Sequence, residues 1–374
     1  RLVDFSPKKI ALLLPFKTKS IDFDSLKLAK NQLKRDGYIN ISTDFYSGVV
    51  MAIDSAKRLG ISTKLDVFDT NAKTTDLNTI LRQTDFSEYN AILGPITLAN
   101  LELTTKSVQN KSVSVVSPFV KTEKAYSNLF QTIPDDRWLQ NKMINYVKND
   151  TIPHETLIIY DSQNSDTADR LKLSFPTAKL LTPNNDQDGN EQFYLMLKDV
   201  QVLLNEGKTN VFLETNNEGF VSNVSSMLNA MNGVVVVTDD QGVETKIERN
   251  ITLMTTSKNR AFDGSNVSNY DLSNLHFQYP SVNFNSDSLG FFGQLYLSKF
   301  GILPNKYAIR GFDLTMDVLL RLSTYGTLLM NTLDIQTVYL ENKFQYILQP
   351  LGGYKNESGY ILKHENLHII KVVD

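Results

Sequence analysis

The stretch that decides the fold is KKIALLLPF at residues 8–16, a short apolar run that ends at Pro15. An apolar run without alternation is typical of a parallel strand covered by helices on both faces. A polar, lysine-rich segment follows at 17–40, and we interpret it as an insertion or flap. STD at residues 42–44 then predicts the N-cap of a helix whose apolar stripe ends at Gly60. A strand followed by such a helix is the first unit of a βαβ series.

The same alternation of strands and helices continues along most of the chain. In the first part, strands are expected at 65–68, 91–93 and 113–116, with helices at 76–84 and 98–109. A second series starts after Pro134, with strands expected at 156–160, 210–213, 234–237 and 251–254 and a helix at about 191–205. The stretch from 257 to 288 shows little periodicity. Helices of about 10 to 15 residues between strands indicate right-handed crossovers and parallel sheets.

The composition excludes several classes of function. A net charge of -3 without a basic stripe argues against a nucleic-acid partner. No apolar run of about 18 residues is present, so we expect no membrane span. The chain lacks cysteine, which excludes thiolate zinc sites, thiol nucleophiles and disulfides. It also lacks the G-x-S-x-G and P-loop patterns, so we expect no enzyme activity, no cofactor and no bound metal.

Eight segments carry a family resemblance through their motifs and their order: 45–56, 65–70, 91–97, 115–118, 130–136, 296–301, 304–308 and 311–313. In this order they resemble the type I periplasmic binding proteins, a family of receptors for amino acids, amides and sugars. The resemblance covers roughly residues 8–325 and is closest to receptors for branched-chain amino acids. It implies an α/β fold of two doubly wound, Rossmann-like lobes, joined by a hinge and closing on a ligand.

The length of the chain agrees with two lobes, because 374 residues exceed what one hydrophobic core usually supports. We expect lobe 1 to comprise residues 1–133 and about 257–325. Lobe 2 is expected to comprise residues 134–256. The tail, at 326–374, alternates apolar and polar residues, and we expect its strands to pack on the lobes or the hinge.

Candidate ligand contacts of lobe 1 follow two strands, where ligands of open α/β sheets bind. Thr97 follows Gly94-Pro95, and Ser117 begins the second turn. In the amino-acid receptors that this chain resembles, small residues and threonine continue that turn, and their hydroxyl and N–H groups hold the ligand carboxylate. Here the turn continues with Phe119 and Lys121, and Lys121 is a candidate partner for an anion. The alternatives are a helix cap at Thr97 and a core position for Phe119.

Candidate contacts of lobe 2 also follow strands. Tyr160 and Asp161 end one strand, and Asp161 is a candidate partner for a ligand amine. Thr215 and Asn216 follow the next strand, and Arg260 lies in the loop after the strand at 251–254. The alternative for Asp161 is a turn, because aspartate often begins one.

Two functions remain open. The first is a non-enzymatic binding or sensing protein that holds a small polar ligand, amino-acid-like or derived from the cell wall. The second is a module that has kept the fold, lost the ligand and contacts a protein partner of the cell envelope or of peptidoglycan. Three observations favour the second: Phe119 in the ligand-facing turn, the insertion at 17–40 and the irregular segment at 257–287.

Both functions predict a periplasmic or otherwise extracytoplasmic location. The chain begins with Arg1 and has no initiator methionine, so we expect a mature or trimmed fragment. An export signal, an anchor or a cell-wall-binding domain is the expected kind of segment upstream of Arg1.

Overall fold

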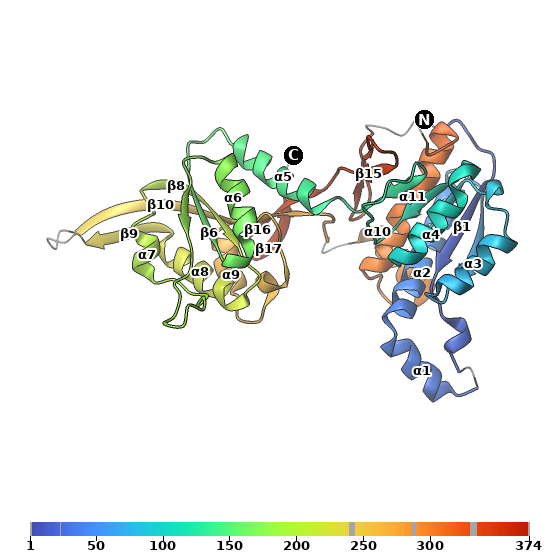
Figure 1. Cartoon of the computed structure of the whole chain (residues 1–374), viewed down its shortest axis with the longest axis horizontal. Helices are drawn as coiled ribbons and strands as arrows, with labels where there is room; N and C mark the ends of the chain where they lie inside the picture. Colours follow the sequence, from blue (N-terminus) through green and yellow to red (C-terminus); the bar gives the residue numbers. More distant parts are fainter. Residues whose placement is uncertain (1, 23, 239–243, 286–288, 330–334, 373–374) are drawn as a thin grey trace. The chain divides into compact units, whose positions relative to one another are not determined.

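The computed structural model describes residues 2–22, 24–238, 244–285, 289–329 and 335–372 (Figure 1). The chain divides into two compact units. Unit 1 comprises Arg1–Asp135 and Val282–Gly359, and unit 2 comprises Asp136–Ser281 and Tyr360–Asp374. The chain therefore passes from one unit to the other three times, after Asp135, after Ser281 and after Gly359.

Unit 1 is built on a mixed, mostly parallel sheet. Its strands, among the described residues, are β1 (Lys8–Leu14), β2 (Thr63–Asp69), β3 (Ala91–Leu93), β4 (Ser114–Ser117), β5 (Leu129–Gln131), β14 (Tyr346–Leu348) and β15 (Tyr354–Asn356). They are ordered β14-β15-β5-β4-β3-β1-β2, and only β14 is antiparallel to its neighbour within this described sheet. A separate antiparallel pair joins β12 (Thr337–Val338) and β13 (Lys343–Phe344). The parallel order follows from the βαβ alternation of the sequence.

Helices cover both faces of this sheet, so successive residues of β1 enter two different cores. The helices and 3-10 turns of unit 1 are η1 (Thr18–Ser20), α1 (Leu26–Arg35), α2 (Gly37–Arg58), α3 (Thr74–Gln83), η2 (Phe86–Glu88), α4 (Leu98–Val108), η3 (Gln109–Lys111), α10 (Gly290–Phe300) and α11 (Lys306–Tyr325). Ile10, Leu12 and Leu14 pack in the core formed with α2 and α11. Ala11 and Leu13 pack in the core formed with α3 and α4. The unbroken apolar run of β1 is thus explained by burial of both faces.

Two glycines let α2 and α11 approach closely. A Cβ added to Gly48 would lie 1.9 Å from the carbonyl oxygen of Ala308. A Cβ added to Gly311 would lie 2.1 Å from the carbonyl oxygen of Phe45. Both distances are far shorter than van der Waals contact, so only glycine fits at these two helix positions.

Unit 2 has a second mixed sheet. Its strands are β6 (Glu155–Tyr160), β7 (Lys179–Leu181), β8 (Gly207–Glu214), β9 (Gly233–Thr238), β10 (Glu244–Met254), β11 (Gln278–Ser281), β16 (Tyr360–Glu365) and β17 (His368–Lys371). The order is β17-β16-β11-β10-β8-β6-β7, and β9 pairs with β10 as an antiparallel hairpin that projects from the unit (Figure 1). The helices and 3-10 turns are α5 (Asp136–Lys148), η4 (Ser162–Asn164), α6 (Ser165–Ser174), α7 (Leu197–Gln201), α8 (Glu218–Met231), η5 (Arg260–Asp263) and α9 (Asn269–Asn274). The two sheets with their flanking helices confirm the predicted α/β class of two doubly wound units.

The tail contributes strands to both sheets. β14 and β15 extend the sheet of unit 1, and β16 and β17 extend that of unit 2. Two buried carboxylates of α11 hold the segment before β14. Asp313 accepts hydrogen bonds from the main-chain N–H groups of Leu340, Glu341 and Asn342. Asp317 pairs with Arg321 at 2.9 Å and accepts a hydrogen bond from Thr337.

The structure corrects the expected boundary near residue 257. Residues 257–281 belong to unit 2, because β11 pairs with β10 and β16. This stretch contains η5, α9 and β11, which its weak periodicity did not indicate.

Two expected helices also differ. α2 begins at Gly37 instead of near residue 44, because the Asp36 carboxylate accepts hydrogen bonds from the N–H groups of Tyr38 and Ile39. The helix expected at 191–205 is only α7, since Leu195 and Met196 bond through their N–H groups to Asn223 and Asp199.

Candidate functional site at the carboxyl ends of the strands

In unit 2, parallel strands β6, β8 and β10 end side by side, so the residues that follow them meet at one edge of the sheet. Four of these residues form what we call the acidic cluster: Asp161, Glu214, Thr215 and Thr255. All four are buried. The sequence predicted Asp161 and Thr215 as candidate contacts, and the structure brings these two together.

The Asp161 carboxylate is held from two sides. It accepts a hydrogen bond from the Thr215 hydroxyl at 2.5 Å and one from the Asn164 side-chain amide at 2.7 Å. The Thr215 hydroxyl in turn accepts a hydrogen bond from the N–H of Asn217 at 3.0 Å. Both oxygens of Asp161 and the hydroxyl of Thr215 are therefore engaged inside unit 2.

Glu214 is the second buried carboxyl of the cluster. It accepts hydrogen bonds from the N–H of Thr256 at 2.6 Å and from the hydroxyl of Thr255 at 3.2 Å. Burial raises the pKa of Glu214 to about 7, and the negative charge of Asp161 adds to this rise, although the hydrogen bonds oppose it. A carboxyl with this pKa exchanges its proton near neutral pH.

The turn after β6 is closed by a carboxylate from another loop. Glu191 accepts two hydrogen bonds from the N–H of Ser162, at 3.0 and 3.2 Å, and one from its hydroxyl at 2.9 Å. A free N–H and a hydroxyl next to each other are the groups that bind a ligand carboxylate. Here the carboxylate of Glu191, a half-buried residue of the same unit, fills that place.

The other candidates of unit 2 lie around the acidic cluster. Asn216 is exposed and accepts a hydrogen bond from the Asn259 side chain at 2.8 Å. Arg260 is exposed at the start of η5. Tyr160 is half-buried and packs against the apolar core of unit 2, so its ring serves the core.

In unit 1, the turn after β4 is closed by its own groups. The Ser117 hydroxyl donates a hydrogen bond to the carbonyl of Val120 at 2.6 Å. The Ser117 carbonyl accepts one from the hydroxyl of Thr132 at 2.6 Å. Ser117 is fully buried, and no part of its side chain reaches solvent. The serine predicted to face a ligand thus stabilises the turn.

A buried arginine holds the same turn from α11. Arg310 donates hydrogen bonds to the carbonyls of Pro118 and Thr132 and to the side chain of Asn342. Its guanidinium lies over the ring of Phe344, 5.1 Å from the centroid. Burial lowers the pKa of Arg310 to about 10, while nearby acidic groups oppose the shift. Arg310 remains charged at neutral pH and stabilises the turn.

Two of the remaining candidates of unit 1, Phe119 and Lys121, contact other residues of unit 1. The third, Thr97, makes no side-chain hydrogen bond within the described residues. The ring of Phe119 packs edge-on against the rings of Phe45 and Tyr307, and the ring centroids are 5.5 and 5.8 Å apart. This packing agrees with the alternative interpretation of Phe119 as a core residue. The Lys121 ammonium donates a hydrogen bond to the carbonyl of Pro134 at 3.3 Å. Thr97 is the N-cap residue of α4, but its side chain makes no capping hydrogen bond.

Sequence reasoning missed Glu214, Glu191 and Arg310. Glu214 is the last residue of an apolar strand, and a glutamate there is a signal that a polar cluster follows. Glu191 and Arg310 lie 29 and 192 positions from the residues that they hold, so no local pattern indicates them.

Within the part of the chain that the structure describes, no group of three or more His, Cys, Asp and Glu side chains is placed to hold a metal ion. In the same residues, no helix combines the length and the apolar character that crossing a membrane requires.

Comparisons with known proteins place the fold. No known protein family and no curated protein matches the sequence. A putative branched-chain amino acid ABC transporter protein from Rhodospirillum rubrum has a similar structure, with a TM-score of 0.61 and 11% identity, over 98% of this chain and 100% of that one. Two structures of LpoA from Haemophilus influenzae are also similar, both at 14% identity. The LpoA C-domain, a regulator of PBP1A, matches with a TM-score of 0.54 over 98% of this chain and 100% of the domain.

The second LpoA structure is the full-length protein. It matches with a TM-score of 0.56 over all of this chain, which spans 60% of its length. At these identities the similarity concerns the fold alone. The resemblance to the type I periplasmic binding proteins is thereby confirmed for the architecture of the chain.

Proposed function

We propose that this chain, which has the fold of the type I periplasmic binding proteins, is a non-enzymatic extracytoplasmic module that contacts a cell-envelope partner. The observation that carries the proposal is the internal use of polar groups at the carboxyl ends of the strands. A receptor for an amino acid needs free hydroxyl, N–H and carboxylate groups there. In this chain the corresponding groups hold one another.

Three hydroxyls carry this observation. Those of Ser117, Ser162 and Thr215 each donate a hydrogen bond within their own unit, to Val120, Glu191 and Asp161. A ligand carboxylate would have to displace each partner and leave it unpaired, which costs about 1 to 3 kcal/mol per buried group. The structural similarity to the LpoA C-domain, a regulator of PBP1A, supports a partner-binding role for the same fold.

A second function, capture of a small polar ligand, is favoured by two residues. Within the described residues, the side chains of Thr97 and Arg260 have no hydrogen-bond partner. Thr97 is half-buried at the end of the turn after β3, and Arg260 is exposed beside the acidic cluster. Thr97 belongs to unit 1 and Arg260 to unit 2, and each group by itself is suited to an anionic or hydroxylated ligand.

The experiment is equilibrium dialysis of the purified chain against labelled amino acids, together with fractionation of the native cells. The proposal predicts no retained amino acid and recovery of the chain with the envelope fraction. Retention of an amino acid by the wild type, and its loss in a Thr97→Val, Arg260→Ala double variant, would establish the second function instead. Recovery in the cytoplasmic fraction would contradict both.

A further inference from the structure

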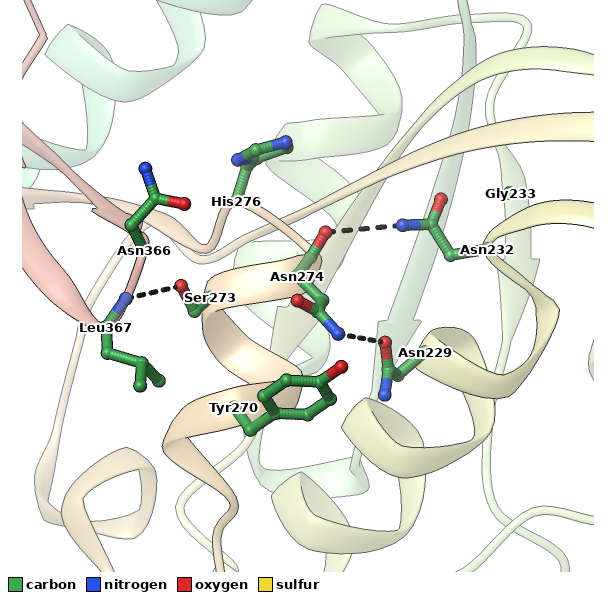
Figure 2. Close-up of a pocket in the computed structure, with 9 residues that line it drawn as sticks. All are labelled: Asn229, Asn232, Gly233, Tyr270, Ser273, Asn274, His276, Asn366 and Leu367. Atoms are coloured by element: carbon green, nitrogen blue, oxygen red, sulfur yellow. Dashed lines mark hydrogen bonds between the residues drawn. The ribbon is translucent and has the colours of Figure 1, made fainter.

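A pocket of unit 2 is lined by nine residues, none of which belongs to the acidic cluster (Figure 2). It has a volume of about 740 Å³. Its wall contains the end of α8 with Asn229, the first residue of β9, the end of α9, and the tight turn between β16 and β17. His276, two residues before β11, also lines it and is shared with a neighbouring pocket of about 450 Å³. The concave surface is therefore longer than one pocket.

One wall is a ladder of asparagine side chains (Figure 2). The Asn232 amide donates to the carbonyl of Asn274 at 3.2 Å, and the Asn274 amide donates to the Asn229 side chain at 3.3 Å. The Asn229 amide donates to Asp271 at 2.7 Å. These bonds join α8 to α9 and fix the positions of the amides. Each NH₂ has a second hydrogen that these bonds leave available.

Among the residues that the structure describes, the side chains of Tyr270, His276 and Asn366 make no hydrogen bond. Tyr270 is 62% exposed, so one face of its ring is open to solvent. An aromatic face beside fixed amides offers stacking and hydrogen bonding together.

The backbone of the pocket adopts unusual conformations. His276, Asn366 and Leu367 have φ values of 46°, 51° and 64°, in the left-handed region that favours glycine. Asn366 and Leu367 form a two-residue hairpin turn, since Glu365 pairs with His368, and the second place of such turns favours glycine. A 65% exposed leucine stands there instead. Residues in strained conformations concentrate at binding sites.

We propose that this pocket binds a neutral saccharide chain. None of the nine residues that line it is Asp, Glu, Lys or Arg, so it offers hydrogen bonds without a formal charge. The asparagine ladder matches hydroxyl and acetamido groups, and the Tyr270 ring matches the apolar face of a sugar. The volume of about 740 Å³ gives room for more than one sugar unit. The proposal does not rest on the proposed function, because the pocket and the acidic cluster share no residue.

The experiment is calorimetric titration of the whole chain with chitotetraose, cellotetraose and maltotetraose at millimolar concentration. We expect at least one to bind, and Tyr270→Ala to weaken that binding at least about tenfold. Asn366→Gly, which keeps the turn and removes the amide, is expected to weaken it severalfold. The matched control is Tyr194→Ala, which removes a tyrosine of unit 2 that is 39% exposed and lies outside the pocket.

Comparison of the three sugars shows which chemical groups of the saccharide the pocket recognises. Preference for chitotetraose indicates recognition of acetamido groups, and preference for either glucan indicates recognition of hydroxyls alone. Absence of binding by all three sugars would overturn the proposal. Equal binding by the wild type and Tyr270→Ala would also overturn it. Neither result would affect the proposed function, which the amino-acid dialysis tests.

Discussion

The strand ends of the two units carry opposite buried charges. In unit 1, the cation Arg310 holds the turn after β4 through the carbonyls of Pro118 and Thr132. In unit 2, the carboxyls of Asp161 and Glu214 are held by hydroxyl and N–H groups. In both places the charged groups have partners inside their own unit.

This difference shows two ways in which the polar groups at the strand ends can be hydrogen-bonded without a ligand. Buried ionisable groups destabilise a protein unless hydrogen bonds compensate for their lost hydration. Unit 1 uses carbonyl acceptors around a guanidinium, and unit 2 uses donors around carboxyls. Removing the charged partner in either unit should therefore destabilise it.

The largest effect is expected for Arg310→Met. The variant leaves the carbonyls of Pro118 and Thr132 buried without their donor, so the free energy of unfolding should fall by about 3 to 5 kcal/mol. Urea denaturation followed by circular dichroism measures it. Arg260→Met is the control, because that exposed arginine of unit 2 should change stability by no more than about 0.5 kcal/mol. Similar losses in both variants would contradict the structural role of Arg310.

Glu214→Gln should change how stability depends on pH. Because the folded-state pKa is raised from 4.5 to about 7, the folded protein binds more protons than the unfolded chain between these values. The contribution of Glu214 to the stability of the wild type should therefore fall by about 3 kcal/mol as pH rises from about 4.5 to about 7. Glutamine does not titrate, so the variant should lose this part of the fall.

The measurement is urea denaturation of both proteins at about pH 5 and about pH 8. Burial also raises the pKa of Glu341 in unit 1 to about 7, but that residue contributes equally to both proteins. Glu206→Gln, at an exposed glutamate of unit 2, is the control and should keep the wild-type dependence. The same pH dependence in Glu214→Gln would show that Glu214 is not the titrating group.

Thr215→Val should have an intermediate effect. Valine has the shape of threonine without the hydroxyl, so Asp161 loses a donor and the N–H of Asn217 loses an acceptor. We expect a loss of about 1 to 3 kcal/mol, measured by thermal and urea unfolding. Thr167→Val, at a half-buried threonine in α6 of the same unit, is the comparison variant. An equally stable Thr215→Val would mean that the acidic cluster does not depend on this hydroxyl.

The smallest stability effect is expected for Glu191→Ala. Glu191 is only half-buried and its partner Ser162 is exposed, so loss of their bonds should lower stability by less than about 1 kcal/mol. The variant exposes the N–H and hydroxyl of Ser162, and weak acetate binding should appear in nuclear magnetic resonance titrations at that turn. Acetate binding of equal strength in the wild type would show that the Glu191 carboxylate does not occupy the N–H and hydroxyl groups of Ser162.

Much of the fold could be predicted from the sequence, because both faces of the parallel strands are buried. The run at 8–16 and the apolar stripe before Gly60 show this directly. The proximity of Asp161 and Thr215 also followed, since the carboxyl ends of neighbouring parallel strands meet.

The partners of these residues could not be predicted, because they depend on contacts distant in sequence. Arg310 reaches Pro118 across 192 positions, and Glu191 reaches Ser162 from a loop without regular structure. The predicted start of α2 was wrong because the chain offers two possible N-caps, one at 42–44 and one at Asp36. Thr43 lies inside that helix and bonds to the Ile39 carbonyl, while Asp36 caps the helix.

The most direct test of the proposed function is a thermal-shift measurement of the wild type with a panel of amino acids, branched-chain ones included. A ligand at 100 times its Kd adds about 2.7 kcal/mol of stability, which would raise the Tm by about 3 °C or more. If the polar groups at the strand ends serve only the protein itself, no amino acid should change the Tm. A reproducible rise that disappears in the Thr97→Val, Arg260→Ala double variant would contradict this and show a working amino-acid site.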